Sequence, residues 1–231
     1  MSRQESRVET NNLQEEIQRR LLGSGADLVG FADISGVRSS INLEQLTAVA
    51  IGIAYDSAVV DRLDSEIEAF ETHLADTKDE METVLEVCVQ CLRQRDFKAW
   101  IHFSKDLPGL LSDFSHKMAA TKAGLGWIGR SSLLVSSEFG CGIRLATVLT
   151  NAAFTPGTPV TESRCGDCTE CVKACPYGAI RGAAWFPAIE RDELLDAFLC
   201  SRKREEHISR LGYKHPCGLC IKACPVGKME A

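Results

Sequence analysis

Cysteine is the residue type in this chain with the greatest capacity for chemistry. Eleven of the 231 residues are cysteines, and eight of them lie in the last third of the sequence. The eight are Cys165, Cys168, Cys171, Cys175, Cys200, Cys217, Cys220 and Cys224. The odd total of eleven cysteines, and a polar N-terminus without the apolar stretch of a secretory signal, favour metal ligation in the reducing cytoplasm over disulfide bonds.

The first four of these cysteines form a C-x2-C-x2-C-x3-C-P run from Cys165 to Pro176. Two-residue gaps let three thiolates converge on one [4Fe–4S] cluster, and in two-cluster proteins the fourth cysteine ligates the other cluster. Zinc is the alternative, since C-x2-C pairs also build zinc sites. Zinc needs only four ligands, however, and gives no reason for the whole run with its proline.

A second, shorter run begins at Cys217 and ends at Pro225. It lacks the first cysteine of the complete run, and Cys200 is the obvious replacement. Because each cluster takes four ligands and the fourth cysteine of a run crosses to the other cluster, the sequence predicts two [4Fe–4S] clusters. Cluster one is expected to bind Cys165, Cys168, Cys171 and Cys224, and cluster two to bind Cys175, Cys200, Cys217 and Cys220. A single-cluster alternative would leave four ligand-like cysteines without a role.

The remaining three cysteines carry weaker signals. Cys88 and Cys91 share a helical stripe with Leu85 and Leu92, where cysteine acts as a small buried hydrophobe. We therefore predict that they pack in the core. Cys141 lies in a glycine-rich turn, where it could approach a bound ligand.

The segment 155–159 divides the chain by composition. Residues 1–155 hold 15 basic and 22 acidic side chains, whereas residues 156–231 hold 11 and 10. The prolines and glycine of the dividing segment indicate a domain edge. We predict an α/β cofactor or substrate domain over residues 1–155 and a ferredoxin-like domain with two clusters over residues 156–231.

Hydrophobic periodicity gives the elements that must position these groups. Apolar runs predict strands at 28–32, 48–54, 99–103, 133–136 and 143–150. Helical spacing predicts helices at 13–21, 112–121 (capped by Ser112) and 190–206. Residues 56–86 hold eleven acidic and two basic side chains interleaved with apolar residues, which indicates the solvated face of one or two amphipathic helices.

A glycine-rich stretch, Gly124-Leu-Gly126-Trp127-Ile-Gly129-Arg130, precedes a strand. A dinucleotide-binding fingerprint has the reverse order, with the glycines after a strand and before a helix. Glycines at this spacing permit close approach to a flat ligand or to another backbone, and both alternatives stay open. The cofactor-binding candidates are Gly124, Gly126, Trp127, Gly129 and Cys141.

The stretch from His116 to Asn151, together with both cysteine runs and Cys200, resembles the epoxyqueuosine reductases, which are related to corrinoid-dependent reductive dehalogenases. The resemblance covers about residues 112–231. It implies a nitroreductase-like core that carries a ferredoxin-like domain with two [4Fe–4S] clusters. It also implies cobalamin in the core, with a flavin as the weaker alternative, and clusters that feed the cofactor electrons to reduce an epoxide in a tRNA nucleoside.

Two departures point to a divergent, short relative. The proton-donating Asp of the family lies upstream of the glycine motif, where a gap-free alignment places Leu110. The chain also ends seven residues after Cys224, without the helical-repeat extension that helps these enzymes hold tRNA. Candidates for the proton donor are His102, Lys105, Asp106, Asp113 and His116, of which we take His116, Asp113 and Asp106 as catalytic candidates.

These patterns predict a cytoplasmic oxidoreductase that passes single electrons through two clusters to a cofactor or a small-molecule substrate. An electron-donor protein of the ferredoxin or flavodoxin type is the expected partner; no tRNA partner and no membrane span are expected. The alternative is a non-catalytic electron carrier or reductive activator, whose acidic 56–86 region would dock a protein partner. An enzyme should have a ligand-sized pocket beside the glycine motif and near a cluster, whereas a carrier should have that space filled.

Overall fold

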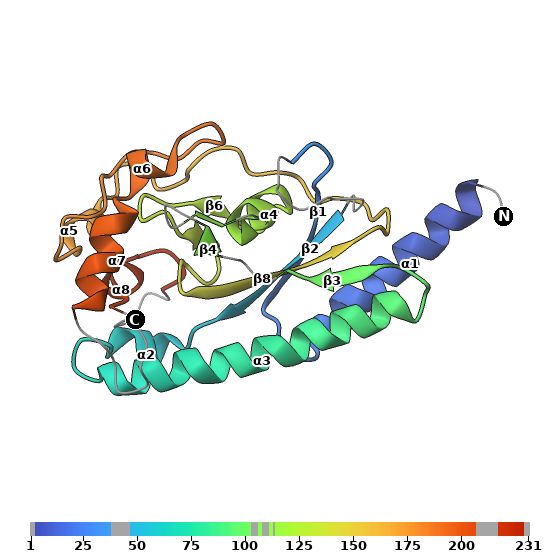
Figure 1. Ribbon diagram of the computed structural model, residues 1–231, viewed down its shortest axis with the longest axis horizontal. Helices are drawn as coiled ribbons and strands as arrows, with labels where there is room; N and C mark the ends of the chain where they lie inside the picture. The colour runs from blue at the N-terminus through green and yellow to red at the C-terminus, as the bar shows by residue number, and fades with distance from the viewer. Residues whose placement is uncertain are drawn as a thin grey trace.

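A four-stranded antiparallel sheet forms the centre of the fold (Figure 1). The computed structural model describes residues 3–37, 47–102, 106–107, 111–112, 114–206 and 217–228. In spatial order the strands are β1 (Leu28–Asp33), β2 (Thr47–Ala54), β8 (Ile143–Thr150) and β3 (Ala99–Ile101). β2 and β8 pair along their whole length, from Thr47 opposite Thr150 to Ala54 opposite Ile143. The expected mixture of helices and strands is confirmed.

Helices cover both faces of this sheet. They are α1 (Arg3–Leu22) and α3 (Ile67–Arg93) on one face and α4 (His116–Lys122) on the other. The larger Val49 and Ile51 of β2 belong to the core that includes α1 and α3, whereas Ala48 and Ala50 belong to the core that includes α4. Burial on both faces explains why this strand is a continuous apolar run in the sequence.

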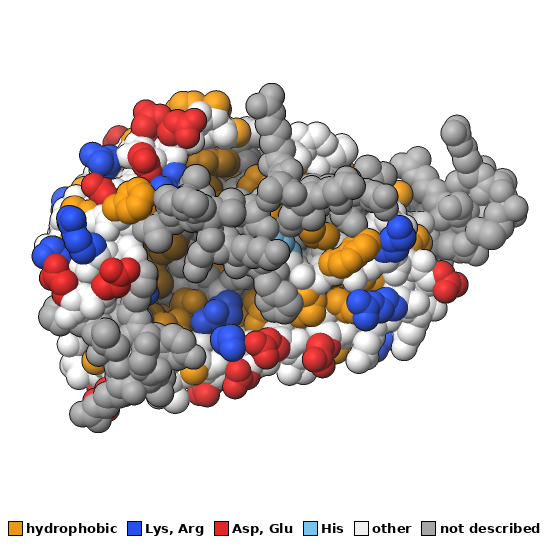
Figure 2. Space-filling model, viewed as in Figure 1, with side chains coloured by type: hydrophobic (Ala, Val, Ile, Leu, Met, Phe, Trp, Pro, Cys, Tyr) orange, Lys and Arg blue, Asp and Glu red, His pale blue; other side chains and the backbone are white. Residues whose placement is uncertain are grey.

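The acidic region of the sequence forms α3 and the short α2 (Ser57–Asp61). Phe70 and Leu85 of α3 are buried, whereas Glu80 and Glu82 are exposed, as the amphipathic pattern predicts. Figure 2 shows acidic side chains gathered along the edge of the molecule that α3 forms. Within the described ranges, no helix combines the length and the apolar character that crossing a membrane requires.

The start of α4 differs from the prediction. Its cap is Ser115, whose Oγ accepts a hydrogen bond from the N–H of Met118 at 3.2 Å. The predicted cap, Ser112, lies in a two-residue strand instead. That strand, β5 (Leu111–Ser112), pairs with β4 (Asp106–Leu107). A hydroxyl can cap a helix only where the chain leaves an extended conformation, and here it does so three residues later.

In its described residues, the cysteine-rich part consists of loops and four short helices. These are α5 (Glu170–Lys173), α6 (Arg191–Leu194), α7 (Ala197–Glu205) and α8 (Leu219–Lys222). The prediction of one helix over 190–206 is wrong, because Leu195 is extended and forms a β-bridge with Ile180. The chain then starts a new helix after Asp196, whose carboxylate accepts a hydrogen bond from the N–H of Leu199 at 2.8 Å.

The segment between the two predicted domains lies against the core. The N–H of Gly157 donates to the carbonyl of Phe31 in β1 at 2.8 Å. A Cβ placed on Gly124 would lie 2.7 Å from the carbonyl oxygen of Thr158. Leu194 of α6 is also buried in the core that contains α4. The cysteine-rich part is thus packed on the sheet domain through several contacts.

The glycine motif leads into a small hairpin of β6 (Trp127–Ile128) and β7 (Leu134–Val135). A Cβ on Gly126 would collide with the carbonyl oxygen of Val135, and one on Gly129 would lie 2.8 Å from Cγ2 of the same residue. Gly126 therefore packs closely against backbone, one of the two alternatives for this motif, whereas Gly129 packs against a side chain.

Replacing Gly126 with Ala should destabilise the protein strongly, because the added methyl group meets rigid backbone. We expect a loss of about 3 kcal/mol, at the upper end for overpacked sites. Gly142→Ala is the matched control, since its Cβ would meet the side chains of Ile221 and Tyr55 at 3.2 and 3.6 Å. Thermal unfolding followed by circular dichroism should show a much larger fall in melting temperature for Gly126→Ala than for Gly142→Ala. Equal shifts would contradict this account of the motif.

Candidate iron–sulfur and ligand site

The four cysteines predicted to hold cluster one line a single small cavity. Cys165, Cys168 and Cys171 come from the first cysteine run, and Cys224 comes from the second. Burial raises the pKa of the Cys171 thiol, and the nearby thiols of the other three raise it further. The structure thus brings together a set of residues that lie far apart in the sequence.

The four cysteines predicted for cluster two also lie near one another. Burial and the nearby thiols of Cys217, Cys200, Cys171 and Cys175 together raise the pKa of the Cys220 thiol to about 12, so cluster-one Cys171 lies near this group as well. In the described part of the chain, no three His, Cys, Asp or Glu side chains have the close spacing that a single metal ion requires. The assignment of ligands to two clusters therefore rests on the two groupings of thiols.

The glycine motif contacts the cluster-one cysteines directly. The indole Nε1 of Trp127 donates a hydrogen bond to Sγ of Cys165 at 3.4 Å, and the guanidinium of Arg164 lies 5.8 Å from the centroid of the same ring. Arg130 donates to the carbonyl of Gly166 at 2.7 Å and to the carbonyl of Gly182. Trp127 and Arg130 therefore hold the first cysteine run against the sheet domain.

Cys141 lies behind the same cavity. It is 5% exposed and packs with Trp127 and Cys224. Its thiol lies 3.8 Å from the carbonyl oxygen of Cys220, and a hydrogen bond to Cys224 is the main cause of its raised pKa. Of the five cofactor-binding candidates, Trp127 and Cys141 thus contact predicted cluster ligands, and Gly129 lies close to Cys165.

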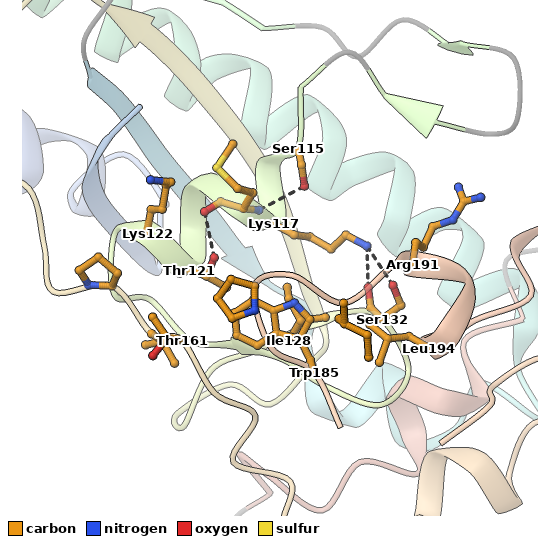
Figure 3. A pocket seen from close by; sticks show the side chains of 15 residues that line it. Ser115, Lys117, Thr121, Lys122, Ile128, Ser132, Thr161, Trp185, Arg191 and Leu194 are labelled. Atoms are coloured by element: carbon orange, nitrogen blue, oxygen red, sulfur yellow. Dashed lines mark hydrogen bonds between the residues drawn. The ribbon is translucent and has the colours of Figure 1, made fainter. Parts of the chain in front are cut away.

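A larger pocket of about 580 Å³ lies between α4 on one side and α6 with the loop before it on the other (Figure 3). Ile128 and Ser132 line it on the side of the glycine motif. Gly129, Arg130 and Ser131, the residues between them, line the cluster-one cavity instead. The two cavities therefore share one segment of chain as a wall.

Lys117 is the most unusual ionisable group of this pocket. Its Nζ donates to the carbonyl oxygen of Ser132 at 2.6 Å and lies 3.5 Å from the hydroxyl of the same residue. Burial, together with the weaker effect of the charge of Arg191, lowers the pKa of Lys117 to about 8. Sequence reasoning missed Lys117, although it adjoins His116; the only local signal was its place in the stretch that resembles a known family.

Of the predicted proton donors, the two histidines that the structure describes, His102 and His116, are not among the residues that line this pocket. Nδ1 of His116 lies 2.9 Å from Oγ1 of Thr147 in β8, so its ring is directed toward the sheet. The rings of His116 and His102 lie 5.3 Å apart. Asp113 and Lys105 lie outside the described residues, and so does the side chain of Asp106. The role of each as a proton donor stays a prediction.

Cys88 and Cys91 are buried in α3, with exposed fractions of 0% and 2%. They pack in the core shared by α1, α3 and the sheet. Burial raises the pKa of both thiols, which keeps them protonated and unreactive. The prediction that these two cysteines serve core packing is confirmed.

Comparisons with known proteins agree with this arrangement. Residues 164–227 match the family described as a 4Fe-4S double cluster binding domain. An epoxyqueuosine reductase from Listeria monocytogenes is 37% identical over 123 residues, which are 52% of this chain and 31% of that protein. The enzyme of the same name from Bacillus subtilis is 30% identical over 120 residues, with shares of 50% and 30%. The resemblance to the epoxyqueuosine reductases is confirmed.

Solved structures show the same fold. The epoxyqueuosine reductase from Bacillus subtilis matches with a TM-score of 0.57 and 21% identity, over 94% of this chain and 66% of that one. A catabolic reductive dehalogenase matches with a TM-score of 0.73 and 19% identity, over 93% and 32%. The residues that match in sequence span about a third of the length of the curated relatives.

Replacing Trp127 with Phe should lower the midpoint potential of cluster one. The N–H group at Cys165 stabilises the extra negative charge of the reduced cluster, and Phe keeps the ring but loses this donor. A hydrogen bond of about 0.5–1.5 kcal/mol corresponds to a shift of roughly 20–60 mV for one electron. Redox titration followed by electron paramagnetic resonance measures it. Trp100→Phe, on the exposed edge strand β3, is the control. Equal cluster-one potentials in the wild type and Trp127→Phe would contradict the assignment of Cys165 as a cluster-one ligand that accepts this hydrogen bond.

Proposed function

We propose that this chain is an iron–sulfur reductase that passes single electrons through two [4Fe–4S] clusters to an acceptor bound beside cluster one. The pocket of about 580 Å³ carries the proposal, because it shares the segment 128–132 with the cluster-one cavity. An electron carrier would be expected to fill this space with side chains. The volume lies within the range of small-molecule sites.

The proposed roles follow from the contacts. Eight cysteine thiolates hold the clusters, with Cys175 and Cys224 each ligating the cluster of the other run. Trp127 and Arg130 fix the position of cluster one against the wall of the pocket. A reduced electron-donor protein of the ferredoxin or flavodoxin type would supply the electrons. The reductase would act in the cytoplasm. We retain residues 1–155 as a nitroreductase-like core and residues 156–231 as the cluster domain.

Cobalamin is the cofactor that the resemblance implies. A corrin ring with its nucleotide tail is larger than the drug-sized ligands that pockets of about 300–1,000 Å³ enclose. The pocket at α4 therefore fits a smaller molecule, and no step proposed for it passes through cobalamin. One relative was solved with an epoxyqueuosine-modified tRNA stem loop. For this chain we propose a small-molecule substrate.

Removal of a crossing ligand tests the cluster assignment. Cys224→Ala should lose the cluster held by Cys165, Cys168 and Cys171, so that the iron content falls from roughly eight to roughly four atoms per chain. Cys141→Ala is the matched control, since this thiol lies beside Cys224 but is not a proposed ligand. Iron analysis and Mössbauer spectroscopy give the counts. Loss of a cluster in Cys141→Ala, or eight irons in Cys224→Ala, would overturn the assignment.

Corrinoid retention tests the cofactor. The protein is reconstituted anaerobically with iron and sulfide, mixed with cobalamin and desalted, and the absorbance spectrum of the protein fraction is recorded. The resemblance alone predicts corrinoid bands beside the broad iron–sulfur absorption, whereas the size of the pocket predicts that absorption without them. Intact clusters without these bands would exclude cobalamin and leave a reductase that acts directly on its substrate. Failure of either cluster to undergo reversible one-electron reduction would sink the reductase proposal itself.

A further inference from the structure

Positive charge gathers in the pocket beside cluster one. Lys117, Lys122 and Arg191 line it, and none of its described lining residues is acidic. Lys117 and Arg191 come from different parts of the chain, α4 and α6, yet they lie close enough for Arg191 to oppose the charge of Lys117. Two like charges held together in a cavity favour a bound anion, which relieves their repulsion.

The counter-charges around these cations lie outside the pocket lining. Nη2 of Arg191 lies 3.1 Å from the carboxylate of Asp192, whose side chain is 68% exposed. Lys122 lies near Asp33 of β1. Hydrogen bonds from Ser35 are the main cause of the lowered pKa of Asp33, and the charge of Lys122 adds a smaller effect. The Nζ of Lys117 donates to the carbonyl and hydroxyl oxygens of Ser132, both neutral. Among the described lining residues, an anion would therefore meet Lys117 without a competing carboxylate.

Apolar and aromatic side chains form the rest of the pocket. Trp185, Ile128 and Leu194 line it together with Met118 and Ile189. Figure 3 shows the amine of Lys117 directed toward Ser132 and Arg191, at one end of the group of side chains, with Trp185 and Ile128 near its middle. An indole beside aliphatic walls favours a flat ring, because rings stack on aromatic faces and bury apolar area.

We infer that this pocket binds a small, planar organic anion, in which a carboxylate or phosphate on an aromatic ring contacts Lys117 and Arg191 while the ring lies against Trp185. The inference rests on the proposed function in one respect: that the bound anion is the substrate of the reductase. The ligand would lie across the segment 128–132 from cluster one.

A matched pair of probes tests the charge requirement. Isothermal titration calorimetry on the cluster-loaded protein compares 2-naphthoate with 2-naphthylmethanol, which has the same ring system but no charge. We expect 2-naphthoate to bind at least tenfold more tightly. 2-Naphthyl phosphate, in a parallel titration, distinguishes a phosphate site from a carboxylate site. Equal binding of the acid and the alcohol, or binding of neither acid nor phosphate, would overturn the inference.

Variants separate ligand contact from a structural role. Lys117→Met should remove the preference for 2-naphthoate over the alcohol, and Lys78→Met, on the exposed face of α3, should keep it. Because Lys117 also ties α4 to Ser132, Arg191→Met provides a second variant at a partly exposed residue. Retention of the full preference in both pocket variants would contradict the assignment of Lys117 and Arg191.

A spectroscopic readout locates the ligand relative to the clusters. 2-Naphthoate should alter the electron paramagnetic resonance signal of cluster one more than that of cluster two, since the cluster-one cavity shares the segment 128–132 with the pocket. No change in the cluster-one signal on saturation would place the ligand elsewhere. Calorimetric binding does not depend on electron transfer, so an inactive reductase that still discriminates between the probes would refute the proposed function and support the anion site.

Discussion

The close contact between the hairpin of the glycine motif and the first cysteine run is the constraint on which the rest of the site depends. The backbone of Val135 packs against Gly126 and its side chain packs against Gly129, at distances that leave no room for a Cβ atom on either glycine. The hairpin is therefore thin, and Trp127 and Arg130 attach it to the loop around Cys165. A thicker wall would move the pocket away from the cluster-one cavity.

The burial pattern of the sheet is largely readable from the sequence. Apolar runs identify β2 and β8 because both faces of these strands are covered, so period-two alternation is absent and continuous apolarity is the signal. Local capping signals are less decisive. Ser112 and Ser115 are both suitable caps, and only the pairing of β4 with β5 determines which one begins the helix. Likewise, the break at Leu195 depends on a bridge to distant Ile180.

The candidate site divides in the same way between local and distant determinants. Spacing alone groups the cysteines, because fixed gaps of two and three residues encode cluster geometry in the chain. The pocket is different, since Lys117 acquires its lowered pKa from burial under a loop that follows much later and from Arg191. No local pattern marks that encounter. The glycine motif was open to two readings because its packing partner, Val135, lies across a hairpin turn.

The composition of the cluster-one cavity has a consequence for biosynthesis. Its described lining comes from three separate stretches: Gly129 to Val135, Arg164 to Cys171, and Cys224 to Val226. Since a chain emerges from the ribosome N-terminus first, the sheet domain can fold long before the last of these stretches exists. Insertion of this cluster is then necessarily a late event. A nascent chain that stalls before Cys224 would expose the apolar surface around Trp127 and three unligated thiols, a species vulnerable to oxidation and aggregation.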